Sequence, residues 1–479
     1  MIKLNQSNLS SVSGIEVPTY DRSLIKTGIL HIGLGNFHRA HQAVYLDQLL
    51  KADQNQEWGI SSAIVRKEQA DLHRSMLAQD GLYTLITLSS NNDAQARVIG
   101  SITELIDGVG DPQLLLDKIA EPSVKIILLT VTEGGYYFSE KENRLLTEHP
   151  DLQADLNGKF RTVYAYLKAG LELRMKNSAG PVTVVTCDNL RMNGDTLKKG
   201  YFLYLNLVNA GELSEWSQEN LTFPNSMVDR ITPKTEPSLS QEIGEEYGFS
   251  DESPIKAEEY IQWVLEDKFI TDRPPFEDAG VEIVTDIHDK EESKIRILNG
   301  GHCAVAWMAA HKGYNFFYEA IGDPQLELFL DNYIRQETLA TLDFVQFDLD
   351  EYYETVKNRF KNKNIPDTIQ RLASEGASRL PKFVLPVIFE RLDRGLPVKY
   401  GFEILAAWFA ALEKDKKGLL HFQHQDQEAE LIDKWFAAAD PLAMFLNDQS
   451  FWEYKDNKKE QFITGIREAL NRLQDTTLK

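Results

Sequence analysis

The stretch "GILHIGLGNFHRAHQ", residues 28–42, decides the fold of this chain. Its glycines Gly33 and Gly35 follow a run of β-type residues and precede a helical pattern. This is the setting of a dinucleotide-binding turn, in which the first glycine makes the tight turn and the second lets backbone N–H groups approach a pyrophosphate. His38 stands where the third glycine of that fingerprint is expected. The turn predicts a nucleotide site, with an ordinary strand-turn-helix as the alternative.

The first part of the chain alternates apolar β-type runs with helical patterns. Candidate strands lie at residues 28–35, 58–65, 124–131, 182–189 and 281–288. Several are continuously apolar, as strands buried on both faces are, and a helix is expected over 37–52. This βα alternation predicts an α/β fold with a Rossmann-type, doubly wound, mostly parallel sheet. Residues 82–89 and 96–102 predict an additional pair of strands.

The last part of the chain has helical periodicity and almost no strand signal. Stretches such as "PQLELFLDNYIRQETLATL" (324–342) and "KYGFEILAAWFAALEKD" (399–415) are helical in period and propensity. A chain of 479 residues also exceeds the size of one ordinary core. We therefore predict a Rossmann-type dinucleotide-binding domain over 1–287 and an all-helical substrate-binding and catalytic C-terminal domain over 288–479.

Composition and charge exclude several classes of protein. The net charge of −22 argues against a nucleic-acid surface, and it disfavours a strongly anionic substrate unless a local Arg/Lys cluster overrides it. No apolar run approaches the roughly 18 residues that cross a bilayer, and the N-terminus shows no secretory signal. Two cysteines, Cys187 and Cys303, make neither a disulfide framework nor a zinc cluster. We expect a cytoplasmic protein.

The stretch "EESKIRILNGGHCAVAWMAAHKG", residues 291–313, carries the candidate chemistry. On an α-helix Lys294, Asn299 and His302 project at about 0°, 140° and 80°, and so share one face of a helix that is otherwise apolar. A buried lysine can act as a general base, while Asn and His donate to a developing oxyanion, as hydride transfer from an alcohol requires. Gly300 and Gly301 leave space for a ligand in this interpretation. A buried polar network with closely packed glycines is the alternative.

The segment after the second candidate strand bears on the choice of cofactor. Glu68 can bind ribose hydroxyls, as in NAD sites, whereas Arg66 or Lys67 can accommodate the 2′-phosphate of NADP. A solvated loop is the alternative for all three. His38 and His41 can share a helix face, but no third metal ligand is evident, so no metal site is predicted and both histidines are expected to be mainly structural.

Seven motifs in order give a specific resemblance. They are "GxGxFHRAHQ", "TVTEGGY" (130–136), "TCDNLRMNG" (186–194), "FPNSMVDRITP" (223–233), "QWVLEDKF" (262–269), "KIRILNGGH" (294–302) and "SRLPKF" (378–383). The chain resembles the long-chain polyol dehydrogenases, the family that includes mannitol 2-dehydrogenases and fructuronate and tagaturonate reductases. The resemblance covers nearly the whole chain and implies metal-independent hydride transfer between a polyol or ketose and a nicotinamide cofactor, as between D-mannitol and D-fructose.

The resemblance also assigns roles to individual residues. It implies that Lys294 is the general base and that Asn299 and His302 bind and polarise the reacting oxygen. The implied substrate contacts are Asn189, Asp229, Arg371 and Arg379, with Glu291 on the route by which the proton leaves. The implied cofactor-binding residues are Gly33, Gly35, Phe37, Arg39, Arg66, Glu68, Gln69, Thr132 and Glu133. Turn residues, solvated charges and a complement to the helix dipole are the alternatives for these side chains.

Two departures from the family pattern leave choices open. Glu68-Gln69 stands where similar mannitol dehydrogenases have Glu-Asp, which predicts NAD use with reduced discrimination, so that NADP also serves. Arg379 replaces the more usual lysine, and its planar fork suits two hydroxyls or a carboxylate. The alternatives are therefore a uronate reductase, a related arabinitol or sorbitol dehydrogenase, a polyol-phosphate dehydrogenase or a non-catalytic nucleotide sensor. We expect a monomer or weak homo-oligomer with a small-molecule substrate and no nucleic-acid or membrane partner.

Overall fold

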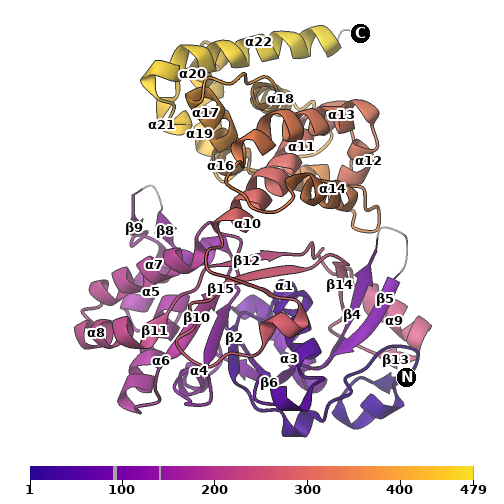
Figure 1. Ribbon diagram of the computed structural model, residues 1–479, viewed down its shortest axis with the longest axis vertical. Coiled ribbons are helices and arrows are strands. Elements are labelled where there is room, and N and C mark those ends of the chain that lie inside the picture. The colour runs from indigo at the N-terminus through magenta and orange to yellow at the C-terminus, as the bar shows by residue number, and fades with distance from the viewer. Residues whose placement is uncertain (90–93, 140–141, 478–479) are drawn as a thin grey trace. The chain divides into compact units, whose positions relative to one another are not determined.

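The computed structural model describes residues 1–89, 94–139 and 142–477. It divides the chain into two units, Met1–Ile287 and His288–Lys479 (Figure 1). The first is a sheet covered by helices, and the second is helical. Each unit is described separately.

A six-stranded sheet forms the centre of the first unit, in the order β11-β10-β7-β2-β3-β6. Its strands are β2 (Ile29–Ile32), β3 (Ile60–Ile64), β6 (Ile102–Asp107), β7 (Ile126–Leu129), β10 (Val182–Thr186) and β11 (Leu221–Thr222). Every neighbouring pair is parallel. The chain winds outward from β2 in both directions, so the strand order reverses there, as in a doubly wound fold. The predicted fold class is confirmed.

Both faces of this sheet are buried. Side chains alternate along a strand, so neighbouring residues enter different cores. Ile127 and Leu129 join one cluster with helices α4 (Pro112–Ile119), α6 (Val163–Lys176) and α7 (Asn193–Leu207). Ile126 and Leu128 join the other, with α2 (Gln42–Leu49) and α3 (Ala70–Ala78). This two-sided burial explains the continuous apolar runs.

The fifth predicted strand does not belong to this sheet. Within residues 281–288 only β16 (Glu282–Val284) is extended, and it pairs with β15 (Gln262–Glu266). Together with β12 (Ser226–Asp229) they form a separate three-stranded sheet. The predicted extra pair is present as an antiparallel hairpin, β4 (Tyr83–Leu88) and β5 (Ala94–Ile99), which β14 (Ile255–Glu258) extends. Two strands of the main sheet were missed, and both lie at its edges. Strand β6 is only partly buried and lacks an apolar run, and β11 has only two residues.

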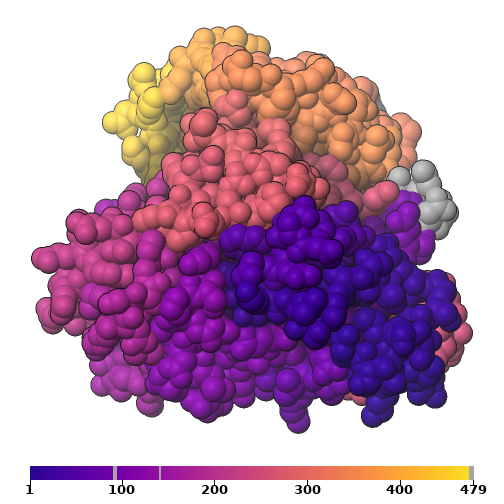
Figure 2. Space-filling model, turned by 60° about the horizontal axis from the view of Figure 1, so that its bottom comes forward, coloured from indigo at the N-terminus to yellow at the C-terminus, as the bar shows by residue number. Residues whose placement is uncertain are grey.

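The N-terminal residues cover one end of the first unit, where they appear indigo in Figure 2. Strand β1 (Ile2–Lys3) pairs with β13 (Phe249–Ser250), and Leu4 and Leu9 pack into a small core with Leu239. Other helices of this unit are α5 (Pro150–Leu156), α8 (Gly211–Asn220) and α9 (Leu239–Tyr247).

The helix predicted over 37–52 is interrupted. It consists of α1 (Asn36–Ala40) and α2, joined at His41, whose backbone leaves the helical region (φ −126°, ψ −87°). Tertiary contacts account for the break. The His41 ring stacks on Phe37 with 4.9 Å between centroids, and its Nε2 lies 2.8 Å from the carbonyl oxygen of Gln262. No local pattern announces these partners, so periodicity alone predicts one helix.

The second unit surrounds one large apolar core. Its two central helices are α11 (Gly300–Lys312) and α18 (Tyr400–Lys416), and Trp307, Trp408 and Trp435 lie fully buried in the core. The other helices are α10 (His288–Ser293), α12 (Phe317–Ile321), α13 (Pro324–Asn332), α14 (Leu349–Phe360), α15 (Ile369–Ala373), α16 (Gly376–Phe383), α17 (Leu385–Asp393), α19 (Ala429–Phe436), α20 (Pro441–Asn447), α21 (Gln449–Trp452) and α22 (Lys459–Thr477). Among the described residues, no helix is long and apolar enough to cross a membrane.

Candidate active site

The glycine turn after β2 has the geometry that its two glycines imply. Gly33 has φ +111°, and a Cβ there would lie 2.1 Å from the carbonyl oxygen of Thr130, so this position requires glycine. Gly35 is the N-cap of α1, and a Cβ there would meet no atom within 4 Å. The first glycine therefore fixes the turn against β7, and the second leaves the backbone open in front of the helix.

His38, at the position of the missing third glycine, lies under the turn. Its ring stacks on that of His31 from β2, with 3.4 Å between centroids and 19° between planes. Both side chains are fully buried. Burial lowers the pKa of His31 to about 3 and that of His38 well below its usual value, so both rings are neutral. A flat ring stack thus provides the close helix–strand contact for which the fingerprint uses glycine.

Two residues expected near the cofactor lie just after the turn. Phe37 is half-buried against His41. Arg39 is 2% exposed, and its guanidinium donates to the carbonyl of Ser253 and to Asn36 Oδ1. It also lies 5.3 Å from the centroid of the Tyr83 ring. A contact between the Arg39 side chain and a cofactor would have to replace these bonds.

Arg66 follows β3, the strand next to the glycine turn, and it is held by two residues from farther along the chain. Its Nη2 donates to Tyr137 Oη (2.6 Å), and its Nη1 lies 3.1 Å from Asp151 Oδ2. The Tyr137 hydroxyl donates to the same carboxylate oxygen. Glu68, two residues after Arg66, is exposed, and Gln69 is half-buried. Sequence reasoning missed Tyr137 and Asp151, which no motif connects to Arg66.

The loop that carries Thr132 and Glu133 is strained and anchored. Thr132 has φ +69°, a rare conformation for a β-branched residue, and both side chains are exposed. The buried carboxylate of Asp188 accepts the backbone N–H groups of Val131 (3.0 Å) and Thr132 (2.9 Å). It also accepts the hydroxyl of Tyr136 at 2.6 Å. Asp188 was overlooked, although it lies inside the "TCDN" motif.

The two substrate contacts expected in the first unit lie at strand ends. Asn189 is exposed and directly follows the anchoring Asp188, after β10. Asp229 is 5% exposed at the end of β12, where its backbone pairs with Gln262 of β15. Asp229 is thus a strand residue and not a turn residue. The guanidinium of its neighbour Arg230 donates to the carbonyls of Glu258 (2.9 Å) and Ala40 (2.6 Å).

In the second unit, the helix that carries Lys294, Asn299 and His302 is not a regular α-helix. It runs from α10 through a π-helical segment, Lys294–Asn299, into α11. π-helical bonds join residues five apart, and the N–H of Gly300 donates to the carbonyl of Ile295. Lys294 and Asn299, also five apart, therefore lie about one turn above each other instead of about 140° around the helix. Lys294 and Asn299 therefore do share one face of the helix, but because the backbone is π-helical and not α-helical.

Polar groups on this face are buried. Lys294 is 7% exposed and Glu291, one turn before it, is 4% exposed. The Nδ2 atom of Asn299 is buried and has no hydrogen-bond partner among the described residues. A buried amide donor without an acceptor costs free energy, about 1–3 kcal/mol, unless a ligand supplies one. Asn299 therefore offers a donor to a bound oxygen.

His302 lies among rings and charges of the second unit. Its ring packs against Phe317 (4.8 Å between centroids) and Phe360 (4.5 Å). Burial is the main reason that the pKa of His302 falls to about 3; the negative charge of Asp367 opposes this shift, and the positive charges of Arg371 and Arg379 add to it. Both arginines, expected as substrate contacts, are thus close enough to act on this ring. A neutral imidazole carries one N–H donor and one acceptor.

The two arginines are oriented by different partners. Arg371 Nε donates to Asp367 Oδ1 at 2.6 Å, and its Nη2 pairs with the other oxygen of that carboxylate. Arg379 Nη1 donates to the backbone carbonyls of Arg371 (3.2 Å) and Leu372 (3.0 Å). Asp367 was missed by sequence reasoning, although its i,i+4 spacing to Arg371 is the signal of such a pair.

The glycines of the "LNGGH" motif pack against protein and do not leave room for a ligand. A Cβ on Gly300 would lie 3.1 Å from the carbonyl oxygen of Phe383, and one on Gly301 would lie 3.1 Å from the Phe360 ring. The expectation of ligand space is wrong at both positions. Glycine is needed here because neighbouring helices approach the backbone closely.

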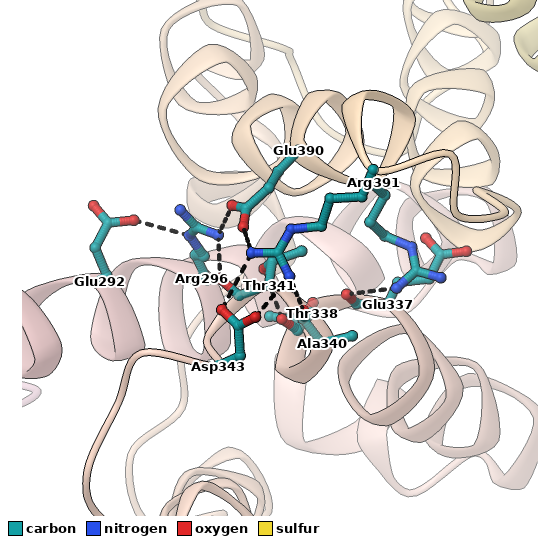
Figure 3. A network of polar contacts seen from close by, with 10 residues as sticks. Glu292, Arg296, Glu337, Thr338, Ala340, Thr341, Asp343, Glu390 and Arg391 are labelled. Carbon is teal, nitrogen blue, oxygen red and sulfur yellow. Dashed lines mark hydrogen bonds and ion pairs between the residues drawn. The ribbon is translucent and has the colours of Figure 1, made fainter.

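A network of charged residues ties the π-helical segment to α17 (Figure 3). Arg296, 9% exposed, donates to Glu292 Oε2 (2.8 Å), Glu390 Oε2 (2.6 Å) and the carbonyl of Thr341 (2.9 Å). Arg391, on the same helix as Glu390, donates to the carbonyl of Glu337 (3.2 Å). Glu337 belongs to a second π-helical segment, Tyr333–Thr338. Helix α17 therefore supports both irregular segments.

The described residues contain no group of three or more His, Cys, Asp or Glu side chains placed to hold a metal ion. Cys187 and Cys303 are both buried and free.

A doubly wound sheet with this glycine turn, followed by a helical unit with a buried lysine and a half-buried asparagine and histidine, defines a Rossmann-type dehydrogenase. Residues 27–278 match the family model of the mannitol dehydrogenase Rossmann domain, and residues 286–474 match that of the mannitol dehydrogenase C-terminal domain. The chain belongs to the mannitol dehydrogenase family.

Named relatives and solved structures support this family assignment. A mannitol 2-dehydrogenase of Phaeosphaeria nodorum is 36% identical, over 99% of this chain and 84% of its own. A D-arabinitol 4-dehydrogenase of Klebsiella pneumoniae is 37% identical, over 92% of this chain and 97% of its own. The structure of Pseudomonas fluorescens mannitol 2-dehydrogenase with NAD and D-mannitol is 33% identical, with a TM-score of 0.88 over 99% of this chain and 97% of that one. A D-sorbitol dehydrogenase structure is 31% identical, with a TM-score of 0.86 over 98% of this chain and 100% of that one.

Proposed function

We propose that this protein is an NAD-dependent mannitol 2-dehydrogenase that interconverts D-mannitol and D-fructose without a metal ion. The observation that carries the proposal is the likeness, over 99% of the chain, to a structure that holds NAD and D-mannitol. Residues 1–287 would bind the cofactor and residues 288–479 would supply the catalytic side chains. The protein would act as a monomer or weak homo-oligomer.

The glycine turn fits a dinucleotide. Gly33 allows a turn that no other residue permits, and Gly35 leaves the space in front of α1 unfilled, as a pyrophosphate requires. Further cofactor contacts would come from Phe37, Arg39, Arg66, Glu68, Gln69, Thr132 and Glu133. When bound, the nicotinamide accepts a hydride from the polyol or returns it to the ketose.

The proton of the reacting hydroxyl would pass to Lys294. This residue is 7% exposed, and a buried lysine is a group that enzymes use as a general base. Asn299 Nδ2, which lacks a protein acceptor among the described residues, would donate to the reacting oxygen. His302 is neutral and would add an N–H donor to that oxygen. These two donors would polarise the oxygen, the role that a metal ion has in other dehydrogenases.

The remaining substrate hydroxyls would bind Asn189, Asp229, Arg371 and Arg379, and Glu291 would pass on the proton from Lys294. A uronate reductase is the second candidate, because Arg371 and Arg379 could both face a carboxylate. The ion pair between Arg371 and Asp367 counts against it, since one of these two positive charges is already neutralised. Neutral hydroxyls suit that balance better.

A substrate panel tests the proposal. Mannitol, arabinitol, sorbitol, fructose and fructuronate are assayed with NAD(H) and NADP(H). Fructose reduction with NADH should exceed all other activities, and fructuronate turning over far better than fructose would refute the assignment. Lys294→Ala should bind NADH normally but lose at least about a thousandfold in kcat, the upper part of the range for general acid–base catalysis. The matched control is Lys312→Ala, which removes an exposed lysine of α11 that pairs with Asp323.

A further inference from the structure

The end of β3 raises a question that the sequence left open. In doubly wound folds the residue after the second strand chooses between cofactors, because a carboxylate there binds the ribose 2′-OH of NAD and an arginine binds the 2′-phosphate of NADP. This chain has Arg66 and Glu68 in that segment. By sequence alone, the arginine favours acceptance of NADP.

The structure gives Arg66 partners from beyond β7. Its two terminal nitrogens contact Tyr137 Oη at 2.6 Å and Asp151 Oδ2 at 3.1 Å. The Tyr137 hydroxyl donates a hydrogen bond to the same carboxylate oxygen of Asp151. Strand β2, with the glycine turn at its end, lies between β3 and β7 in the sheet. The three side chains therefore join segments that follow the two neighbours of the glycine-turn strand.

The negative charge of Asp151 neutralises the positive charge of Arg66. Tyr137 and Arg66 hold the pKa of Asp151 below its usual value, so the carboxylate is charged at neutral pH. Side chains of Arg66 and Asp151 are 40% and 29% exposed, so a nucleotide could reach them. A 2′-phosphate carries about two negative charges. To bind Arg66 it would have to share the guanidinium with Asp151, at a distance where like charges repel.

We propose that Asp151 and Tyr137 determine cofactor specificity: they hold Arg66 in an ion pair, withhold it from a 2′-phosphate and so favour NAD over NADP. The inference rests on the proposed function, since it requires the nucleotide to bind at the glycine turn. It predicts discrimination against NADP even though Gln69 stands where similar mannitol dehydrogenases have a carboxylate. The choice of cofactor then depends on a residue 85 positions away from the arginine it controls.

Binding of adenosine fragments tests the inference without turnover. Isothermal titration calorimetry measures adenosine 2′,5′-bisphosphate and adenosine 5′-monophosphate against the full chain. In Asp151→Asn the bisphosphate should bind about tenfold more tightly, while the monophosphate changes less than about twofold. The gain should shrink as salt is raised, because a partly exposed charge is screened. Adding Arg66→Ala to Asp151→Asn should abolish it.

Two further variants separate the specific effect from general ones. Glu148→Gln removes a nearby exposed carboxylate that pairs with Arg144 instead, and it should leave both affinities unchanged. Tyr137→Phe keeps the carboxylate but frees one guanidinium nitrogen, and should give a smaller gain. Titrations of NADH and NADPH with the same proteins provide a second readout, in which the NADPH to NADH affinity ratio rises about tenfold in Asp151→Asn.

The outcomes distinguish this inference from the proposed function. If the unmodified protein binds NADH but Asp151→Asn leaves the affinity ratio within twofold, the inference is wrong and the proposed function stands. An equal change in Glu148→Gln also overturns it, because net charge would then be the cause. If neither nucleotide nor fragment binds the unmodified protein, both the inference and the proposed function fail.

Discussion

Arg296→Met should markedly destabilise the second unit, because it removes a buried positive charge that bonds both Glu292 and Glu390 (Figure 3). Arg296 pairs with Glu292, whose side chain is 5% exposed, and with Glu390, at 26% exposed. Methionine fills a similar volume but leaves the Glu292 charge buried beside an apolar group. Breaking a buried pair in this way costs about 3–5 kcal/mol.

That cost predicts a measurable shift in melting temperature. For a unit of this size each kcal/mol lowers the midpoint by about 2–4 °C, so Arg296→Met should melt roughly 6–20 °C below the unmodified protein. Differential scanning calorimetry measures the shift. Hydrogen exchange should show faster exchange in the π-helical segment Lys294–Asn299, which Arg296 ties to Thr341 and α17.

The double variant Glu292→Gln, Arg296→Met is the control for mechanism. It removes both charges, so part of the stability should return, because loss of a pair costs less than stranding one member. Arg296→Lys keeps the charge but loses the fork that reaches three acceptors, and should lie in between. A melting point of Arg296→Met within about 2 °C of the unmodified protein would refute the reasoning.

Two further predictions concern the glycine turn. Gly33→Ala should abolish NADH binding and destabilise the first unit, since a Cβ would lie 2.1 Å from the carbonyl oxygen of Thr130; normal NADH titration in this variant would contradict the geometry. Acid should destabilise the same unit: the pKa of His31 is about 3 in the fold and about 6.5 when unfolded, so the unfolded state binds more protons below pH 6.5 and stability falls from there toward pH 3. At pH 5 the loss is about 2 kcal/mol, measured by urea unfolding at pH 7.5 and 5. His31→Phe, which keeps a flat ring, should remove the contribution of His31, about 2 kcal/mol at pH 5, while the buried His38 keeps its own contribution. An equal pH dependence in both proteins would count against this reasoning.

The sequence predicts what local patterns determine. Four strands of the main sheet were predicted from apolar runs, which occur because both faces of these strands are buried. The turn was predicted from Gly33, whose positive φ is accessible mainly to glycine. The helical second unit followed from period and propensity. These features depend on neighbours in the chain.

Features that depend on distant partners were not predictable. The break at His41 requires Gln262, and the neutralised Arg66 requires Asp151. The π-helical segment Lys294–Asn299 departs from the α-helix that the sequence predicts over residues 291–313. Its stability comes from contacts such as those of Arg296, which only the folded chain assembles.

The same dependence on partners applies to the catalytic helix. Lys294, Asn299 and His302 were identified by type and spacing, yet the angle between the first two rested on the wrong helix geometry. Gly300 and Gly301 were assigned to a ligand, although Phe383 and Phe360 occupy the space above them. The types of residue indicate which chemical groups are available. The local backbone geometry and the packing around it determine where those groups lie.

The stack of His31 on His38 limits how this turn can be engineered. Restoring glycine at position 38 would leave an empty space the size of an imidazole ring above β2, and such cavities destabilise a core. A standard nucleotide-binding cassette grafted over residues 33–38 would therefore be incompatible with the strand beneath it. Strand β2 and the turn after it would have to be exchanged together, because His31 lies on the strand and His38 follows the turn.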